Sequence, residues 1–115
     1  MAKRVPLISL TFGAAETTKQ SSRISENQGV HQGKCTHIKI TLPAFTNNPT
    51  ATLQVLDSDG DVIFSQAAIA DDQTLVIADK SIPLIEKETV KVILSGAPGG
   101  TGGTVTVRLY YLPME

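Results

Sequence analysis

Apolar and polar residues alternate along most of this chain, and this pattern constrains its fold more than any other feature. Successive side chains of a strand point to opposite faces, so a period of two predicts strands with one buried face. In the C-terminal stretch, the best example, the apolar positions are Val105, Val107, Leu109 and Tyr111. The pattern recurs at 7–12, 37–42, 51–55, 62–66, 74–77, 82–85, 90–94 and 104–111. Seven or eight short strands separated by turns predict an all-β fold, an antiparallel sandwich of jelly-roll or Greek-key type.

The length of 115 residues allows one hydrophobic core and no second one. Because only 4% of the residues are aromatic and none is Trp, Val, Ile, Leu and Thr must fill that core. We therefore expect a single domain, with an N-terminal strand and polar arm or long connection over 1–35 and the sandwich body over 36–115. Within the first part, Gly13–Lys34 is polar apart from Ile24 and Val30. A helix over 14–20 is conceivable but would lack an apolar stripe.

Two hairpins are predicted from their turns. Asp59-Gly60 is typical of a two-residue type I′ turn, which places Val55 opposite Phe64 and Leu56 opposite Ile63. This hairpin is then apolar on both sides, so its outer side must be covered by the N-terminal segment or by a partner.

The second hairpin contains the stretch Gly96–Gly103, in which five of eight residues are glycine. A strand follows it, whereas a phosphate-binding loop leads into a helix, so a nucleotide site is excluded. We expect a mobile, solvent-exposed tip that becomes ordered only against a neighbouring molecule.

Three carboxylates, Asp57, Asp59 and Asp61, lie within five residues and raise the question of calcium binding. An EF-hand loop needs glycine at position six and glutamate at position twelve, but these positions are not matched here. The residues fit the tip of a hairpin, and whether they also bind a cation is left open.

His31, Cys35 and His37 are the candidates for a metal site or for a Cys-His nucleophile, since positions 35 and 37 of a strand share one face. Structural zinc needs four ligands, and the sequence has no further Cys or His. A Gly-x-Ser-x-Gly motif is also absent. We expect no catalytic residue, no metal, no cofactor and no enzymatic activity, and we interpret Cys35 as a small buried hydrophobe.

The formal net charge of −1 and the lack of a basic cluster argue against nucleic acid as a partner. The N-terminus resembles neither a secretory signal nor a membrane span, and one cysteine cannot form an internal disulfide. We expect no membrane partner and synthesis in a cytoplasm.

Three stretches, Asp57–Phe64, Ile82–Leu84 and Val90–Tyr111, together resemble a known class of protein. They are similar to small β-sandwich virion proteins of tailed bacteriophages, of the kind that decorate or cement capsids. The resemblance covers roughly residues 36–113. It implies a non-enzymatic protein made in the host cytoplasm, located in the virion and bound to capsid or tail subunits as a symmetric homo-oligomer. It assigns no role to any single residue.

The main hypothesis is a phage head decoration or accessory protein that contacts its neighbours through its arm and exposed apolar side chains. The candidate interface residues are Leu56, Ile63, Ile24 and Tyr110. The alternative is a small module that binds a ligand or a carbohydrate. Sugars usually stack on exposed aromatic rings, and Tyr110, on the outward side of the last strand, is the obvious candidate here.

Overall fold

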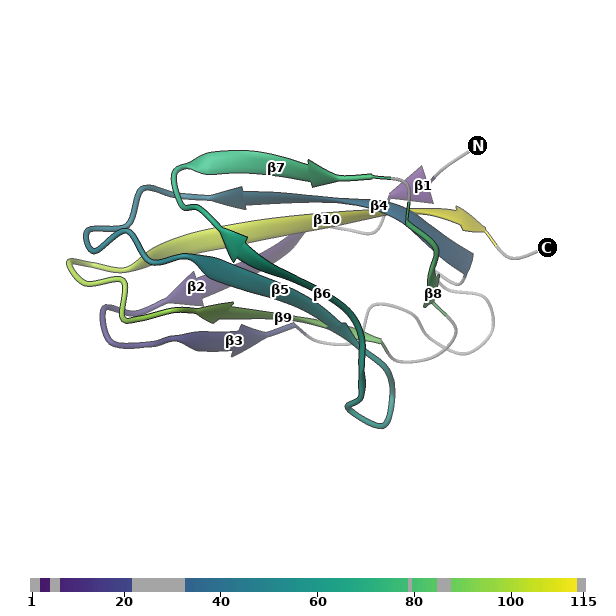
Figure 1. Ribbon diagram of the computed structural model, residues 1–115, viewed down its shortest axis with the longest axis horizontal. Helices are drawn as coiled ribbons and strands as arrows, with labels where there is room; N and C mark the ends of the chain where they lie inside the picture. Colours follow the sequence, from purple (N-terminus) through teal and green to yellow (C-terminus); the bar gives the residue numbers. More distant parts are fainter. Residues whose placement is uncertain (1–2, 5–6, 22–32, 79, 85–87, 114–115) are drawn as a thin grey trace.

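The alternating segments form the strands of two antiparallel sheets that pack face to face (Figure 1). The computed structural model describes residues 3–4, 7–21, 33–78, 80–84 and 88–113. Six strands form the first sheet: β1 (Lys3–Arg4), β2 (Ile8–Phe12), β4 (Gly33–Leu42), β7 (Gln73–Ile77), β8 (Ile82–Leu84) and β10 (Gly103–Pro113). Four form the second: β3 (Thr18–Gln20), β5 (Ala51–Leu56), β6 (Val62–Ile69) and β9 (Thr89–Leu94). The predicted all-β sandwich is confirmed.

The long strands β4 and β10 pair along the centre of the first sheet. Their outer neighbours are short: β1 and β2 both pair with β10, while β7 and β8 both pair with β4. The second sheet has the order β3-β9-β5-β6. The described part of the chain contains no helix that could span a membrane.

The core lies between the two sheets and consists mainly of aliphatic side chains. The inward residues of β10 and β4 are fully or nearly buried, and so are those of β5 and β9: Val105, Val107, Leu109, Ile38, Ile40, Leu42, Leu53, Val55, Val90, Val92 and Leu94. One aromatic pair closes the end of the core, where Phe12 and Phe45 meet edge to face at 6.5 Å between ring centroids. The alternation seen in the sequence therefore corresponds to the inner faces of both sheets.

The polar N-terminal part contributes strands that its composition does not predict. Thr18–Gln20 pair with Lys91–Ile93 as an edge strand, and backbone bonds from Ser21 to Val90 and from Leu94 to Thr17 extend the contact. An edge strand needs no apolar stripe, because backbone hydrogen bonds hold it. The strands of the sandwich thus lie on both sides of the boundary predicted at residue 36. Ile24, Val30 and His31 lie outside the described residues.

The β5–β6 hairpin has the predicted register near its middle and a different turn. Val55 lies opposite Phe64 as expected, but a bulge then places Leu56 opposite Val62 instead of Ile63. The Gly60 amide donates to the Asp57 carbonyl at 3.0 Å, and Gly60 alone in the turn has a positive φ, of 85°. The connection is therefore a three-residue loop with a glycine bulge, and the two-residue type I′ turn predicted from Asp59-Gly60 is wrong.

The glycine-rich segment is not a free tip, contrary to the sequence-based expectation. Pro98 is buried, its carbonyl accepts the Asn47 amide at 2.9 Å, and the Gly99 amide donates to the Ala14 carbonyl at 3.0 Å. These bonds fasten the loop to two other loops of the same chain. Gly102, with φ of 74°, lies so close to Phe12 that any Cβ atom would overlap the Phe12 carbonyl oxygen. The glycines allow close backbone packing rather than mobility.

We therefore expect Gly102→Ala to lower the free energy of unfolding by about 2 kcal/mol or more, through strain at positive φ and overlap with Phe12. Gly96→Ala is the matched control, because a Cβ there meets no atom within 4 Å and φ is not positive. Urea denaturation of the two variants measures the difference. Equal stability of both variants would show that the loop does not pack as described.

Candidate functional site

A bulge in β4 decides which side chains face outward on the first sheet. His37 lies opposite Tyr110 and Cys35 lies opposite Tyr111, so Thr36 is an extra residue without its own partner. Cys35 and Ile38 are both buried in the core, although three positions separate them. The bulge reverses the alternation, because an inserted residue turns the following side chains to the other face. The expectation that Cys35 and His37 share a face is wrong.

His37 and Tyr110 form a stacked pair on the outer face of this sheet. Their ring centroids are 4.5 Å apart and their planes differ by 13°. The Thr36 hydroxyl contacts the His37 Nδ1 at 2.9 Å, which orients the imidazole. Tyr110, a predicted interface residue, is thus partly buried and lies flat against the His37 ring.

Beside this pair lies a shallow hollow of about 210 Å³ on the outer face of β4 and β10. It is lined by Leu7, Lys39, Thr41, Thr106, Arg108 and Tyr110. Lys39 and Arg108 are direct cross-strand partners, so two positive charges lie side by side. Like charges in this arrangement destabilise a sheet by a few tenths of a kcal/mol up to about 1 kcal/mol.

The Arg108 side chain also has a hydrogen-bond donor without an acceptor. Its Nε is buried and has no hydrogen-bond partner among the described residues. A buried donor without an acceptor costs about 1–3 kcal/mol, and more when it belongs to a charged group. The hollow therefore combines two neighbouring cations with an unsatisfied donor, and a carboxylate or another acceptor would relieve both the repulsion and the unmet hydrogen bond.

No carboxylate of the first sheet can supply that acceptor. Its six strands contain five Lys or Arg residues and neither Asp nor Glu. Every Asp and Glu that the structure describes lies outside the strands, in turns and loops. An ion pair between Lys19 and Glu16, at 2.6 Å, lies at the edge of the second sheet. A chain of nearly zero net charge thus has a basic sheet surface, which the overall composition does not reveal.

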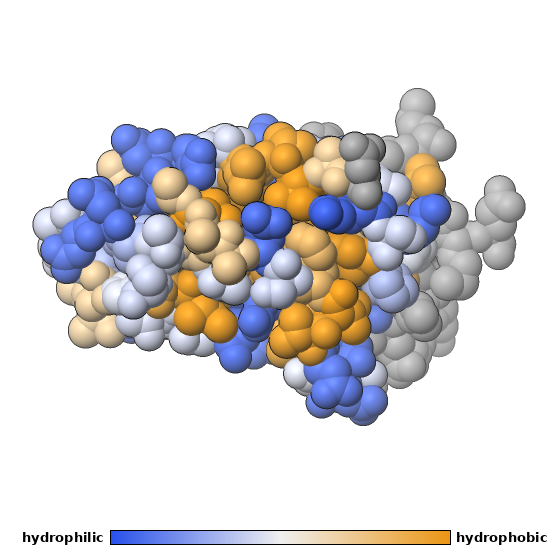
Figure 2. Space-filling model, in the orientation of Figure 1, coloured by the Kyte–Doolittle hydropathy of each residue, from blue (hydrophilic) through white to orange (hydrophobic). Residues whose placement is uncertain are grey.

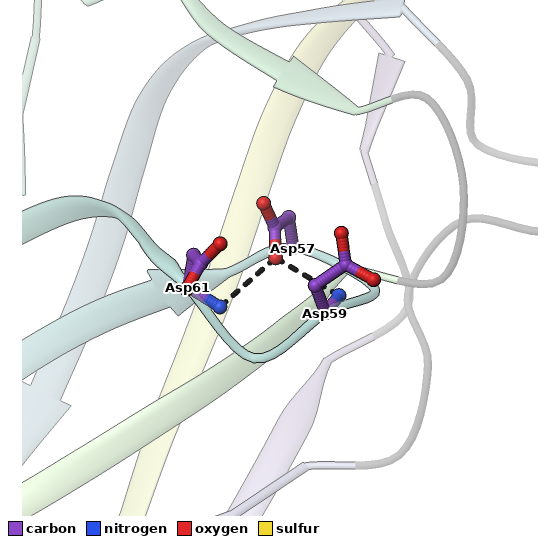
Figure 3. A group of neighbouring side chains, drawn as sticks. All are labelled: Asp57, Asp59 and Asp61. Atoms are coloured by element: carbon purple, nitrogen blue, oxygen red, sulfur yellow. Dashed lines mark hydrogen bonds between the residues drawn. The ribbon is translucent and has the colours of Figure 1, made fainter.

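The carboxylates Asp57, Asp59 and Asp61 lie together at the exposed β5–β6 turn (Figure 3). The Asp57 Oδ1 accepts the backbone amides of Asp59 at 3.0 Å and of Asp61 at 2.9 Å. Asp57 therefore shapes the turn, whereas Asp59 and Asp61 project from it into solvent. One oxygen from each of the three carboxylates lies within 4.8 Å of the others. The turn is thus a compact centre of negative charge.

The predicted interface residues differ in their exposure. Leu56 is only 7% exposed, so it offers no surface to a partner, and its prediction as an exposed contact is wrong. The bulge after Val55 explains the error, because it breaks the alternation from which the outward position was inferred. Ile63 is partly buried and packs against the core. The large apolar side chains that are exposed among the described residues are Leu7, Val62, Val76 and Leu112.

Cys35 is buried in the core and its thiol donates to the His37 carbonyl at 3.6 Å. Burial raises the pKa of this thiol to about 11, because the thiolate would lose its solvation. A thiol with this pKa is a poor nucleophile at neutral pH. Since His37 lies on the opposite face, the described residues do not form a Cys-His pair.

We expect the Cys35 thiol to react with a disulfide reagent at pH 8 at least ~100-fold more slowly in the folded chain than in urea, since about one thiol in a thousand is ionised. Because the pKa is higher in the folded than in the unfolded chain, the free energy of unfolding should fall as the pH rises from 9 towards 11. Stopped-flow thiol titration and urea denaturation measure the two effects. Equal rates in the folded and unfolded chain would contradict the burial of Cys35.

Comparison with known proteins gives similarity at the level of structure. No protein-family model matches the chain, and no curated protein matches its sequence. The fold is similar to a chain in the capsid asymmetric unit of cyanophage Pam1, with a TM-score of 0.61 and 21% identity over 97% of this chain and 85% of that one. It is also similar to a chain in the acidic stable capsid of Helicobacter pylori bacteriophage KHP30, with a TM-score of 0.51 and 13% identity over 99% and 95% of the two chains.

A third similar structure comes from a different class of protein. The module CBM27-1 of Caldicellulosiruptor saccharolyticus, solved with mannohexaose, has a TM-score of 0.54 and 14% identity over 95% of this chain and 74% of that one. At such identities the likeness establishes the fold alone. The chain is an all-β sandwich of a kind found in phage capsids and in a carbohydrate-binding module.

Proposed function

We propose that this chain is a non-enzymatic structural protein of a tailed-phage virion, a head decoration or accessory protein that assembles on capsid subunits as a homo-oligomer. The observation that carries the proposal is the likeness to the Pam1 capsid chain, which extends over almost the whole of both chains. A match of this extent concerns the complete sandwich and not a shared fragment.

The surface of the described residues is consistent with a binding role. Its sheet face offers a stacked aromatic pair, two cations and exposed apolar side chains, and Tyr, Arg and apolar residues are enriched where proteins contact one another. Cys35 and His37 lie on opposite faces, so these two described residues do not form the Cys-His pair that a thiol hydrolase would need. We place the protein in the virion after synthesis in the host cytoplasm, with capsid or tail subunits as partners.

This proposal predicts that the purified protein sediments with empty heads assembled from the major capsid protein encoded near its gene, and that it forms a homo-oligomer in solution. Sucrose-gradient sedimentation and size-exclusion chromatography with light scattering measure the two properties. Heads from an unrelated phage are the control, since specific binding depends on complementary surfaces. A strict monomer that does not sediment with its own heads would refute the proposal.

A carbohydrate-binding module is the second candidate, favoured by the likeness to CBM27-1 and by the Tyr110–His37 stack beside the hollow. The shortage of aromatic residues opposes it, since the chain has two Tyr and no Trp to form a sugar platform.

Under the main proposal, titration calorimetry with mannohexaose and a glycan array should detect no binding. Should a glycan bind, Tyr110→Ala would abolish binding at this face, whereas Val76→Ala would not, because Val76 is exposed on the same sheet without lining the hollow. Binding that depends on Tyr110 would favour the carbohydrate module over the virion protein.

A further inference from the structure

The hollow on β4 and β10 and the turn between β5 and β6 have complementary charge. The hollow contains Lys39 and Arg108 with a buried, unsatisfied Nε, and no Asp or Glu of its own sheet. The turn exposes Asp59 and Asp61, whose side chains take no part in shaping it. Each surface thus has the charge that the other lacks, which is the usual basis of oriented protein association.

We propose that the hollow of one copy of this chain binds the Asp57–Asp61 turn of a second copy. The contact cannot form within one molecule. The turn belongs to the second sheet (Figure 1), whereas the residues that line the hollow lie on the outer face of the first. The proposal rests on the self-assembly part of the proposed function and specifies the surfaces that would produce it.

The shapes of the two surfaces fit this arrangement. The β5–β6 turn projects from the body of the molecule as a hydrophilic knob, next to an area of hydrophobic residues (Figure 2). The hollow on β4 and β10, which would receive this turn, is a shallow cavity with room for side chains. A projecting acidic turn would bring a carboxylate to the Arg108 guanidinium, whose fork of donors matches two carboxylate oxygens.

Apolar contact would accompany the ion pairs. Val62 directly follows the turn and is 50% exposed, and Leu7 lines the hollow and is 52% exposed. In the proposed contact, Val62 of the copy that supplies the turn and Leu7 of the copy that supplies the hollow would shield the charged pairs from water. Shielding strengthens such pairs, since exposed ion pairs alone contribute little.

The contact joins two different patches, so it is heterologous. Every copy has one hollow and one turn and can bind one neighbour on each side. The assembly is then a closed ring if the rotation between copies closes, and an open chain if it does not.

Charge reversal tests the contact from both sides. One variant, Asp59→Lys with Asp61→Lys, gives a basic turn, and another, Lys39→Glu with Arg108→Glu, gives an acidic hollow. Each variant alone opposes like charges, so we expect its self-association to weaken at least ~10-fold. Mixed in equal amounts, the variants again pair opposite charges, and association should return. Lys91→Glu, on the outer face of the other sheet, is the matched control and should associate like the wild type.

Sedimentation velocity over a range of concentrations measures the association, and circular dichroism checks that each variant folds. If the double change in the hollow prevents folding, Lys39→Glu alone replaces it, since Lys39 is exposed. Raising the salt from about 20 mM to about 500 mM should weaken wild-type association, because screening acts on such pairs.

Self-association that is equal in the wild type and both variants would overturn this inference and leave the proposed function intact. A mixture that stays dissociated would also overturn it. A wild type that is monomeric at every concentration would overturn it together with the self-assembly part of the proposed function. Sedimentation with heads then decides separately whether the chain binds capsids.

Discussion

The structure depends on one constraint, the burial of aliphatic side chains between two sheets that contain few aromatic rings. Each fully buried Val, Leu or Ile contributes about 1.5–3 kcal/mol, and the sandwich obtains its stability from many such side chains. Small branched side chains fill the space only if the sheets approach closely along their whole length. The long strands β4 and β10 meet this requirement, because their inward residues run through the core without interruption from Ile38 to Leu42 and from Val105 to Tyr111.

Alternation in the sequence predicted this part of the fold because every second side chain of a strand with one buried face enters the core. All eight predicted strands are present, and Val55 lies opposite Phe64 as the hairpin pattern indicated. The two additional strands, β1 and β3, lie at sheet edges, where backbone hydrogen bonds suffice and no apolar pattern is required. Composition alone cannot distinguish such an edge strand from a loop.

Two of the errors, the shared face of Cys35 and His37 and the outward position of Leu56, have one physical origin, the insertion of single residues into strands. The extra residue Thr36 places Cys35 and His37 on opposite faces of the sheet. The bulge after Val55 pairs Leu56 with Val62. One signal was available in the sequence: if Cys35 is buried, as a free cysteine usually is, it is out of phase with Ile38. Two buried residues of a strand whose numbers differ by an odd value, as those of Cys35 and Ile38 do, indicate a bulge between them. The close packing of the glycine-rich loop had no comparable signal, because Pro98 and Gly102 are fixed by residues distant in sequence.

The candidate site depends on the same bulge. Without the extra residue at Thr36, Cys35 and His37 would lie on one face, and the imidazole would not lie beside both Tyr110 and the outward cations. With it, β4 presents His37, Lys39 and Thr41 in one outward row facing Tyr110, Arg108 and Thr106 of β10. The acidic residues meanwhile occupy turns, where Asp accepts backbone amides and Gly60 adopts the positive φ that the connection needs. The separation of charge between sheet and turns therefore follows from local backbone requirements, and it gives the described strands of the first sheet and the β5–β6 turn opposite charge.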